Sequence, residues 1–331
     1  MPIITKTKAS WQKLIQDVIT EPADLLAALG LTDSSAVLAQ SSFKLRVPRR
    51  WLDCIKPGDL KDPVLLQILP RAQEQVALPG FTHDPLQEQD AIPVPGLLHK
   101  FTNRVLLTLT GSCVLHCRYC FRRNFPYTDN TPSKQLGPIL DYLKAHPEVT
   151  EVILSGGDPL SLSDDYLAFV IQSLEQIPSI QYLRFHTRLL SIIPERATDE
   201  LIYLLANSRF TTTLVLHMNH PQEILPALKP AIARLRQEAN VQVLLQAVLL
   251  KDINDTVETL VELYETLYTY GVLPYYLHLL DKVSGAHHFE VTATEAKVLY
   301  QGLLKRLPGF LVPRFVQEIP KLPYKQPLFL E

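Results

Sequence analysis

The chain has 331 residues, of which 47% are hydrophobic and 20% are charged, a balance typical of a globular protein and not of a disordered one. Lys and Arg number 32 against 34 Asp and Glu, so the net charge of −2 argues against nucleic acid or an anionic membrane surface as a partner. We find no apolar run of the roughly 18 residues that a membrane-spanning helix needs, and residues 1–12 lack the apolar region of a secretory signal. We therefore expect a cytoplasmic protein, with metal-binding or catalytic roles favoured over disulfides for its 4 cysteines.

Residues 1–97 have a mainly helical and irregular pattern, which predicts an N-terminal cap or arm on a larger unit. We expect helices over 11–19 and 22–29, the second of them ended by Gly30. The chain contains 26 prolines, and these are scattered between apolar segments, as is typical of element boundaries. The basic stretch 44–51 (KLRVPRRW) is most simply interpreted as a solvated face or a packing edge.

Residues 98–290 alternate short apolar segments with longer helical ones. The pattern predicts strands over 104–110, 151–154, 182–186, 212–217, 241–249 and 273–280. It predicts helices between them over 133–145, 163–176, 195–207, 221–237 and 255–269. Parallel strands need such crossover connections, so we expect an α/β fold with a partial, TIM-like (β/α)6 barrel. Residues 291–331 would add a C-terminal helix, a strand and a tail.

Polar residues follow these strands one after another. They are Cys113, Cys117 and Cys120 after the first strand, residues 155–158 after the second, His186 ending the third, His217 and Asn219 at the end of the fourth, Gln246 late in the fifth, and Asp281 after the sixth. Barrel enzymes assemble their active sites where the loops at the C-terminal ends of the strands converge. The sequence therefore predicts one shared pocket.

Three cysteines are concentrated in the segment CVLHCRYC, which contains Cys113, Cys117 and Cys120. Structural zinc would need a fourth ligand, and no second pair of metal-binding residues follows in the sequence. An iron–sulfur cluster accepts thiolates readily, and with only three of them a [4Fe-4S] cluster keeps one iron open. We therefore expect such a cluster and no zinc, with inert cysteines as the alternative. Cys54 stands alone and is expected to be a buried apolar residue.

The CxxxCxxC spacing directly after a first strand resembles the radical S-adenosylmethionine (radical SAM) enzymes. The resemblance implies that SAM chelates the open iron, and that an electron from the cluster cleaves SAM to methionine and a 5′-deoxyadenosyl radical. Taken alone, the segment SGGDP is equally typical of a turn. Within this resemblance, the residues implied to bind SAM are Ser155, Gly156, Gly157, Asp158, His186, His217 and Asn219.

A narrower resemblance, to the lysine 2,3-aminomutase family, covers roughly residues 98–331. It is carried by HKFTNRVLLTLTGSCVLHCRYCFRR, SGGDPL, LRFHTR, HMNHPQEI, LLKDINDT and YYLHLLDKVSGAHHF. The chain resembles most the short bacterial branch that makes β-lysine for modifying elongation factor P. Longer family members carry additional zinc-binding cysteines between subunits. Here Thr256 occupies one such position and no cysteine follows Cys120, which leaves open whether the chain forms a homo-oligomer.

The family resemblance also implies pyridoxal 5′-phosphate (PLP), bound as an aldimine by a lysine near the C-terminus. The family has a glycine-rich GGGGK-TP segment there, whereas this chain has EIPKLPYKQP, so Lys325 is the aldimine candidate and Lys321 its rival. Such a lysine needs a pKa lowered by burial or by a neighbouring cation. Lys100 and Arg104 match family positions near the PLP phosphate, and Gln246 matches a polar position facing the cofactor.

Three further residues match family positions that bind the substrate. Arg122 matches the arginine that binds the substrate α-carboxylate, for which a planar guanidinium is well suited. Asp281 and Glu318 match the two carboxylates that hold the distal ammonium, although the family more often has Asp at the second position. Two carboxylates in one pocket repel each other unless a cation lies between them, as a lysine ammonium would. The simpler alternatives are a cap for Asp281 and a surface pair of Glu318 with Lys321.

The resemblance implies an isomerase that moves the 2-amino group of L-lysine to C3 and releases (R)-β-lysine. The implied partners are an electron donor such as flavodoxin or ferredoxin, and a functional link to elongation factor P and its β-lysine ligase. Two alternatives stay open: a 2,3-aminomutase for another amino acid, and a non-catalytic zinc-binding interaction protein. Whether free or protein-attached lysine is the substrate is also open.

Overall fold

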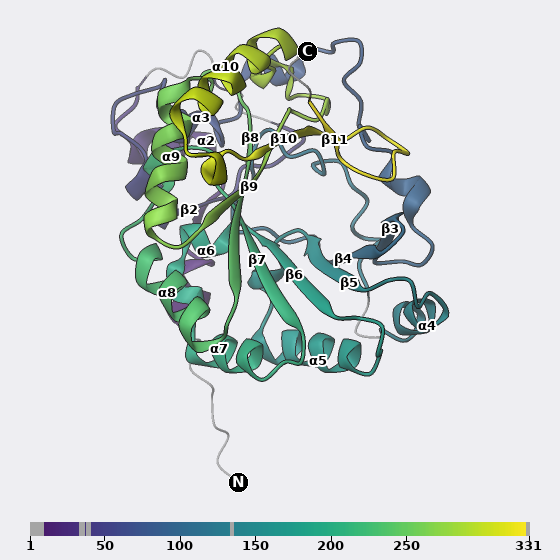
Figure 1. Ribbon diagram of the computed structural model, residues 1–331. Coiled ribbons are helices and arrows are strands. Elements are labelled where there is room, and N and C mark those ends of the chain that lie inside the picture. The colour runs from purple at the N-terminus through teal and green to yellow at the C-terminus, as the bar shows by residue number, and fades with distance from the viewer. Residues whose placement is uncertain (1–9, 33–36, 38–40, 133–135, 329–331) are drawn as a thin grey trace.

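The computed structural model describes residues 10–32, 37, 41–132 and 136–328, and a curved sheet runs through its centre (Figure 1). The strands of this sheet are β3 (Leu97–Phe101), β4 (Arg104–Thr110), β5 (Glu151–Gly156), β6 (Tyr182–Thr187), β7 (Thr211–His217), β8 (Gln242–Val248), β9 (Leu273–His278), β10 (Arg314–Gln317) and β11 (Gln326–Pro327). Their order across the sheet is β11-β10-β9-β8-β7-β6-β5-β4-β3. Strands β4 to β10 run parallel, whereas β3 and β11 pair antiparallel at the edges. The predicted α/β class and its six parallel strands are confirmed, and β10 extends the parallel part.

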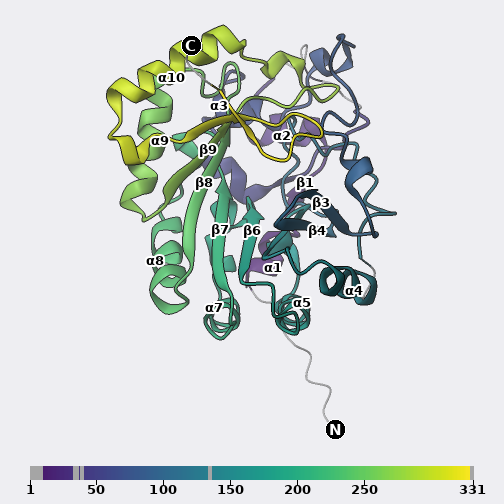
Figure 2. The same cartoon turned by 45° about the vertical axis from the view of Figure 1, so that its right-hand side comes forward.

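Helices connect the parallel strands and cover the outer face of the sheet (Figures 1 and 2). They are α4 (Gly137–Ala145), α5 (Asp164–Glu175), α6 (Leu189–Ile192), α7 (Asp199–Ala206), α8 (Leu228–Glu238), α9 (Val257–Thr269) and α10 (Ala293–Arg306). The side-chain oxygens of Ser163, Thr198, Thr256 and Thr292 accept hydrogen bonds from backbone amides where α5, α7, α9 and α10 begin. None of the helices in the described part of the chain combines the length and apolar character that a bilayer crossing demands.

Two of the helices predicted between the strands are shorter than expected, and another lies partly outside the described residues. The helix predicted over 195–207 is observed as α7, and a 3-10 turn over Pro194–Arg196 stands before it. The helix predicted over 221–237 is reduced to α8, because Pro226 disfavours the helical conformation in the residue before it. A single 3-10 turn stands in the first part of that range. The helix predicted over 133–145 is observed as α4, and residues 133–135 lie outside the described residues.

The N-terminal region contains short elements that pack beside the barrel. They are α1 (Ser10–Leu14), β1 (Val18–Ile19), α2 (Pro22–Ala28), β2 (Val47–Pro48) and α3 (Pro63–Leu66). The second predicted helix is confirmed as α2, and Gly30, with a φ of +68°, follows its end. The helix predicted over 11–19 is confirmed only in its first half, as α1. The second half of the prediction is wrong, because β1 forms there and pairs with β2. The β-branched side chains of β1 favour a strand, and its partner is distant in sequence.

The basic stretch 44–51 is a packing edge, which confirms the simpler interpretation. Arg46 Nη2 donates to the carbonyl of Ile15 at 3.1 Å, and Arg49 Nε pairs with Asp17 Oδ1 at 3.1 Å. Trp51 is completely buried. These contacts tie the stretch to the beginning of the chain.

The two edges of the sheet meet across the barrel interior through a charged contact. Lys100 in β3 donates from Nζ to Glu318 Oε1 at 2.8 Å, and Glu318 directly follows β10. The C-terminal strands, in yellow, accordingly lie above β3 in both views (Figures 1 and 2). The open barrel is thus bridged at its gap by side chains and not by a backbone ladder.

The loops after β4 and β5 touch backbone to backbone. The amide of Gly157 donates to the carbonyl of Thr110 at 2.6 Å, and the amide of Asp158 donates to the carbonyl of Ser112 at 2.9 Å. A Cβ added to Gly157 would lie 2.3 Å from the carbonyl oxygen of Ser112, closer than any real contact. A residue without a side chain is therefore required here.

We predict that Gly157→Ala destabilises the protein by about 1–3 kcal/mol, because the added methyl group must displace a backbone and not a side chain. Gly137→Ala is the matched control, since nothing lies within 4 Å of a Cβ added at that position. Urea denaturation followed by circular dichroism measures both variants. Equal stability of the two would contradict the close approach described here.

Candidate active site

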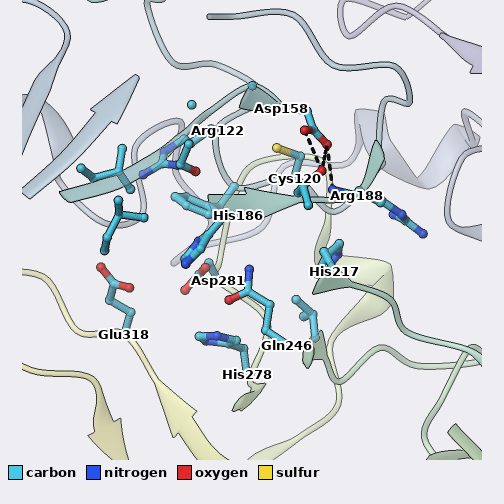
Figure 3. A pocket seen from close by; sticks show the side chains of 18 of the residues that line it. Cys120, Arg122, Asp158, His186, Arg188, His217, Gln246, His278, Asp281 and Glu318 are labelled. Atoms are coloured by element: carbon cyan, nitrogen blue, oxygen red, sulfur yellow. Dashed lines mark hydrogen bonds between the residues drawn. The ribbon is translucent and has the colours of Figure 1, made fainter. Parts of the chain in front are cut away.

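One cavity lies inside the curved sheet, toward the C-terminal ends of the parallel strands, and its wall contains nearly all the residues predicted from the sequence. These are Lys100, Arg104, Cys113, Cys117, Cys120, Arg122, Ser155, Gly156, Gly157, Asp158, His186, His217, Gln246, Asp281, Glu318 and Lys325. Alternate residues of a strand point to the same face of a sheet. Ser155, His186, Gln246 and His278 face inward in this way from β5, β6, β8 and β9. Figure 3 shows Cys120, Asp158 and Arg188 toward one side of this space, and Gln246, His278 and Glu318 toward the other.

Asn219 is the exception among the predicted residues, because it does not line the cavity. Its side chain is completely buried, and Nδ2 donates to Tyr119 Oη at 2.6 Å and to Gln67 Oε1 at 3.1 Å. Its Oδ1 accepts from the amide of Val248 at 2.9 Å. These hydrogen bonds join the ends of β7 and β8, and the SAM contact expected of Asn219 stays a prediction.

Asp158 lines the cavity but directs its carboxylate into the protein. It accepts hydrogen bonds from Thr187 Oγ1 at 2.8 Å and from the amides of Arg188 and Leu189, both at 2.7 Å (Figure 3). Burial raises the pKa of Asp158, although these hydrogen bonds oppose the shift. Asp158 thus fixes the loop after β5 against the end of β6.

The three clustered cysteines are free thiols on one loop, and all three reach the same cavity. Within the described residues, no group of three His, Cys, Asp or Glu side chains is close enough together to hold a single metal ion. A four-iron cluster spaces its three thiolates more widely than one ion does. Burial raises the pKa of Cys120 to about 11, and the nearby Cys117 adds to the effect, so a bound cationic group would be needed to keep the Cys120 thiol ionised. The donor set fits an iron–sulfur cluster.

Cys54 lies apart from this loop, in the core beside the N-terminal elements. It is 6% exposed, and burial raises the pKa of its thiol to about 12. The prediction that Cys54 is a buried apolar residue is confirmed.

A chain of alternating charges crosses the other half of the cavity. Glu88 binds Arg122 in a fork, with Nε to Oε2 at 2.7 Å and Nη2 to Oε1 at 2.8 Å. Lys100 Nζ lies 3.1 Å from Glu88 Oε1 and 2.8 Å from Glu318 Oε1. Lys325 donates to the second oxygen of Glu318. Each predicted ligand-binding cation of this half, Arg104 apart, is therefore paired with a protein carboxylate.

Burial and neighbouring charges shift the pKa values of these groups in opposite directions. Burial alone would raise the pKa of Glu318, but Lys325 and Lys100 hold it well below its usual range. Burial, with the negative charge of Glu318, raises the pKa of Asp281 to about 7. Burial, with the positive charge of Lys325, lowers the pKa of His278 to about 3, so this imidazole is neutral. Among the described residues, Asp281 and Asp158 are the carboxylates of this cavity that form no ion pair, and Asp158 accepts hydrogen bonds from Thr187 and backbone amides instead.

Of the two candidate lysines near the C-terminus, only Lys325 reaches the cavity. Lys321 is 72% exposed and pairs with Asp90 at 3.4 Å on the surface. The simpler alternative for Glu318, a surface pair with Lys321, is therefore wrong. Arg104 lies over the ring of Phe101 at 4.2 Å and has no carboxylate partner among the residues that the structure describes. Its guanidinium fits a phosphate, whereas Lys100 is already bound to two carboxylates.

Sequence reasoning missed two residues that hold predicted ones in place. Glu88 comes from the N-terminal region, and no local pattern connects it with Arg122, because the two lie 34 positions apart. Arg188 donates from Nη1 to the sulfur of Cys117 at 2.7 Å. Arg188 directly follows β6, and this position at the end of a strand is the sequence feature that could have identified it.

Comparisons with known proteins give the following similarities. Residues 107–275 match the Radical SAM superfamily. An L-lysine 2,3-aminomutase of Escherichia coli is 44% identical over 99% of this chain and 96% of its own length, and one of Haemophilus influenzae is 44% identical over 98% and 96%. The L-lysine 2,3-aminomutase of Clostridium subterminale is 33% identical over 94% of this chain but 75% of its own length. A solved radical SAM methyltransferase from Sphaerobacter thermophilus gives a TM-score of 0.47 at 17% identity, covering 66% of this chain and 68% of that one.

Full-length coverage distinguishes the shorter relatives from the longer clostridial one, and this chain aligns with the shorter bacterial branch. The chain therefore belongs to the lysine 2,3-aminomutase family, a family of isomerases within the radical SAM superfamily.

Proposed function

We propose that the protein is a lysine 2,3-aminomutase that moves the 2-amino group of L-lysine to C3. The observation that carries this proposal is the single cavity in which three free cysteines face a set of paired charges suited to both ends of lysine. The 33–44% identity to L-lysine 2,3-aminomutases supports it independently.

The cysteine half of the cavity would hold the [4Fe-4S] cluster and SAM that the superfamily implies. Cys113, Cys117 and Cys120 would bind the cluster, and the glycines at 156 and 157 let backbone groups approach SAM closely. Bound together there, the two cofactors supply a carbon radical able to abstract hydrogen from the substrate. His186 lines the same cavity, and its buried Nε2 has no partner among the described residues, so it can bond to a ligand.

The opposite half would hold PLP, for which we propose Lys325 as the covalent attachment residue. PLP supplies a carbonyl carbon to which an amino group can bind. The proposal is supported by the position of Lys325 inside the cavity and by the guanidinium of Arg104, which has no carboxylate partner among the described residues and is suited to the phosphate. Gln246 faces the same space (Figure 3). Lys325 must leave Glu318 in order to react.

Recognition of lysine would use the residues that now pair with one another. Glu88 binds the Nε and Nη2 atoms of Arg122. The remaining Nη1 faces Ser155 Oγ at 3.3 Å and would be available to a substrate carboxylate. Glu318 already binds two ammonium groups of the protein, and Asp281 lies beside it without a matching cation. An incoming distal ammonium would complete this set, whereas an acidic side chain would be repelled.

Finer features of the proposal rest on the resemblance to the short bacterial branch. We propose an (R)-β-lysine product, its use in modifying elongation factor P together with a β-lysine ligase, and work in the cytoplasm. An external reductant such as flavodoxin or ferredoxin would supply the electron.

Conversion of lysine is the direct test of this function. Protein reconstituted anaerobically with iron and sulfide, then supplied with PLP, SAM and a reductant, is expected to convert L-lysine to (R)-β-lysine. Chiral chromatography of the amino acids measures the product. Absence of β-lysine from enzyme with full cofactor content would refute the proposal, and bound zinc in place of iron would point to a non-catalytic protein.

The attachment residue can be tested without turnover. After incubation with PLP and reduction with borohydride, peptide mass spectrometry is expected to find a pyridoxyl group on Lys325. Lys325→Ala should lose the label, because Lys325 is the candidate amine within the cavity. Lys321→Ala is the matched control and should keep it, since Lys321 lies on the surface. Labelling of Lys321 in the unmodified protein would contradict the assignment.

The pKa of Asp281 predicts a pH-dependent cost to stability. Its pKa is raised from 3.8 to about 7, so the folded protein binds this proton more tightly than the unfolded chain does. Stability from this group is therefore greatest at low pH and falls as the pH rises from about 4 to 7. Asp281→Asn is expected to be more stable than the unmodified protein by up to roughly 4 kcal/mol at pH 8, with little difference near pH 4.

Thermal melts across this pH range measure the effect, and Asp141→Asn, at a site 78% exposed, is the control. Addition of L-lysine at pH 8 should stabilise the unmodified protein more than Asp281→Asn, because the ammonium neutralises the carboxylate. A constant difference between the two proteins at every pH would show that Asp281 does not titrate in this range.

A further inference from the structure

Arg188 connects the cysteine loop with the rest of the protein through four short hydrogen bonds. Its Nη1 donates to Cys117 Sγ at 2.7 Å and to Tyr119 Oη at 2.6 Å. Its Nη2 donates to Gln67 Oε1 at 2.7 Å and to Glu223 Oε2 at 3.1 Å. The side chain is 7% exposed. A buried guanidinium thus touches the sulfur of a predicted cluster ligand.

The surroundings of Arg188 hold the guanidinium in one place. Its plane lies over the ring of Trp51, 4.8 Å from the centroid. Glu223 is completely buried and accepts three further hydrogen bonds, from Gln67 and from the amides of Asn219 and His220. The charge of Arg188 is therefore built into a fixed network that includes residues of the N-terminal region.

We propose that Arg188 is a positioning residue that fixes the Cys117 thiolate and sets the reduction potential of the cluster. This proposal deepens the proposed function, because it rests on the [4Fe-4S] cluster but not on lysine as the substrate. Reduction adds one electron and no proton to the cluster. An N–H donor and a positive charge beside a ligand sulfur stabilise that added negative charge and raise the potential.

The two charges of the network act on the cluster in opposite directions. Removing the positive charge of Arg188 makes reduction harder and should shift the midpoint potential to a more negative value. Removing the negative charge of Glu223 takes away the carboxylate that offsets the positive charge of Arg188. The midpoint potential should then shift to a more positive value. Arg188→Lys keeps the charge but loses the fork, so its midpoint should lie between those of the unmodified protein and Arg188→Gln.

Arg196 offers a closely matched control for the loss of a buried guanidinium. It is completely buried, pairs with Asp164 at 2.6 Å and lies 4.4 Å over the ring of Trp11. Its other hydrogen bonds go to the carbonyls of Leu160 and Leu162, and none of these partners is a cysteine. Arg196→Gln should therefore leave the midpoint potential unchanged, even where it lowers the melting temperature.

The experiment is an anaerobic redox titration of reconstituted protein without SAM or lysine, followed by electron paramagnetic resonance of the reduced cluster. The variants are Arg188→Gln, Arg188→Lys, Glu223→Gln and Arg196→Gln, with iron and sulfide content measured for each. The expected result is a negative shift for Arg188→Gln, a positive shift for Glu223→Gln and no shift for Arg196→Gln. Because no turnover is involved, failure of lysine conversion would not affect this result.

An unchanged or more positive midpoint in Arg188→Gln would overturn the proposal. So would a shift of the same size in Arg196→Gln, because the effect would then come from general loosening of the core. If Arg188→Gln does not fold, Arg188→Lys and Glu223→Gln decide the question, since only the proposed role predicts midpoint shifts of opposite sign.

Discussion

The pairing of buried charges across the cavity is the constraint on which the rest of the site depends. Ionised groups inside a protein are costly unless each one has a partner of opposite charge. Here the partners come from parts of the chain that are distant in sequence. Glu88 belongs to the N-terminal region, Lys100 to the first edge strand, Arg122 to the segment after the cysteine loop, and Glu318 to the end of the sheet. Satisfying these charges brings the edges of an open barrel together.

The same pairing prepares the cavity for its ligands. A protein carboxylate lies against the guanidinium expected to bind a substrate carboxylate, and two protein ammonium groups lie against the carboxylate expected to bind a substrate ammonium. In the proposed binding mode, the substrate carboxylate would use the Nη1 side of Arg122 while Glu88 keeps the Nε side, and the distal ammonium would join Glu318 and Asp281, so few charges would stay unpaired. Buried networks also hold the cysteine half, where Arg188 and Asp158 fix the loops after β4, β5 and β6.

Much of the fold could be predicted because its strands follow a regular apolar pattern between prolines and helix caps. All six predicted strands were confirmed, and the convergence of strand ends correctly placed Cys113 and Asp281 in one cavity. The errors arose where distant residues decided the local structure. The pairing of β1 with β2 replaced half of a predicted helix, and Asn219 turned into the wall to bond with Tyr119. Glu88 could not be found from sequence, since an isolated glutamate in an irregular segment shows no pattern.

The bridge between Lys100 and Glu318 has a consequence for how the protein is made. The two residues are separated by 218 positions, so Glu318 leaves the ribosome long after Lys100. Among the described residues, Glu88 is the carboxylate partner of both Lys100 and Arg122 until Glu318 emerges and adds the second partner of Lys100. The cavity is therefore completed late in biosynthesis, and a chain that ends before Glu318 could not complete it.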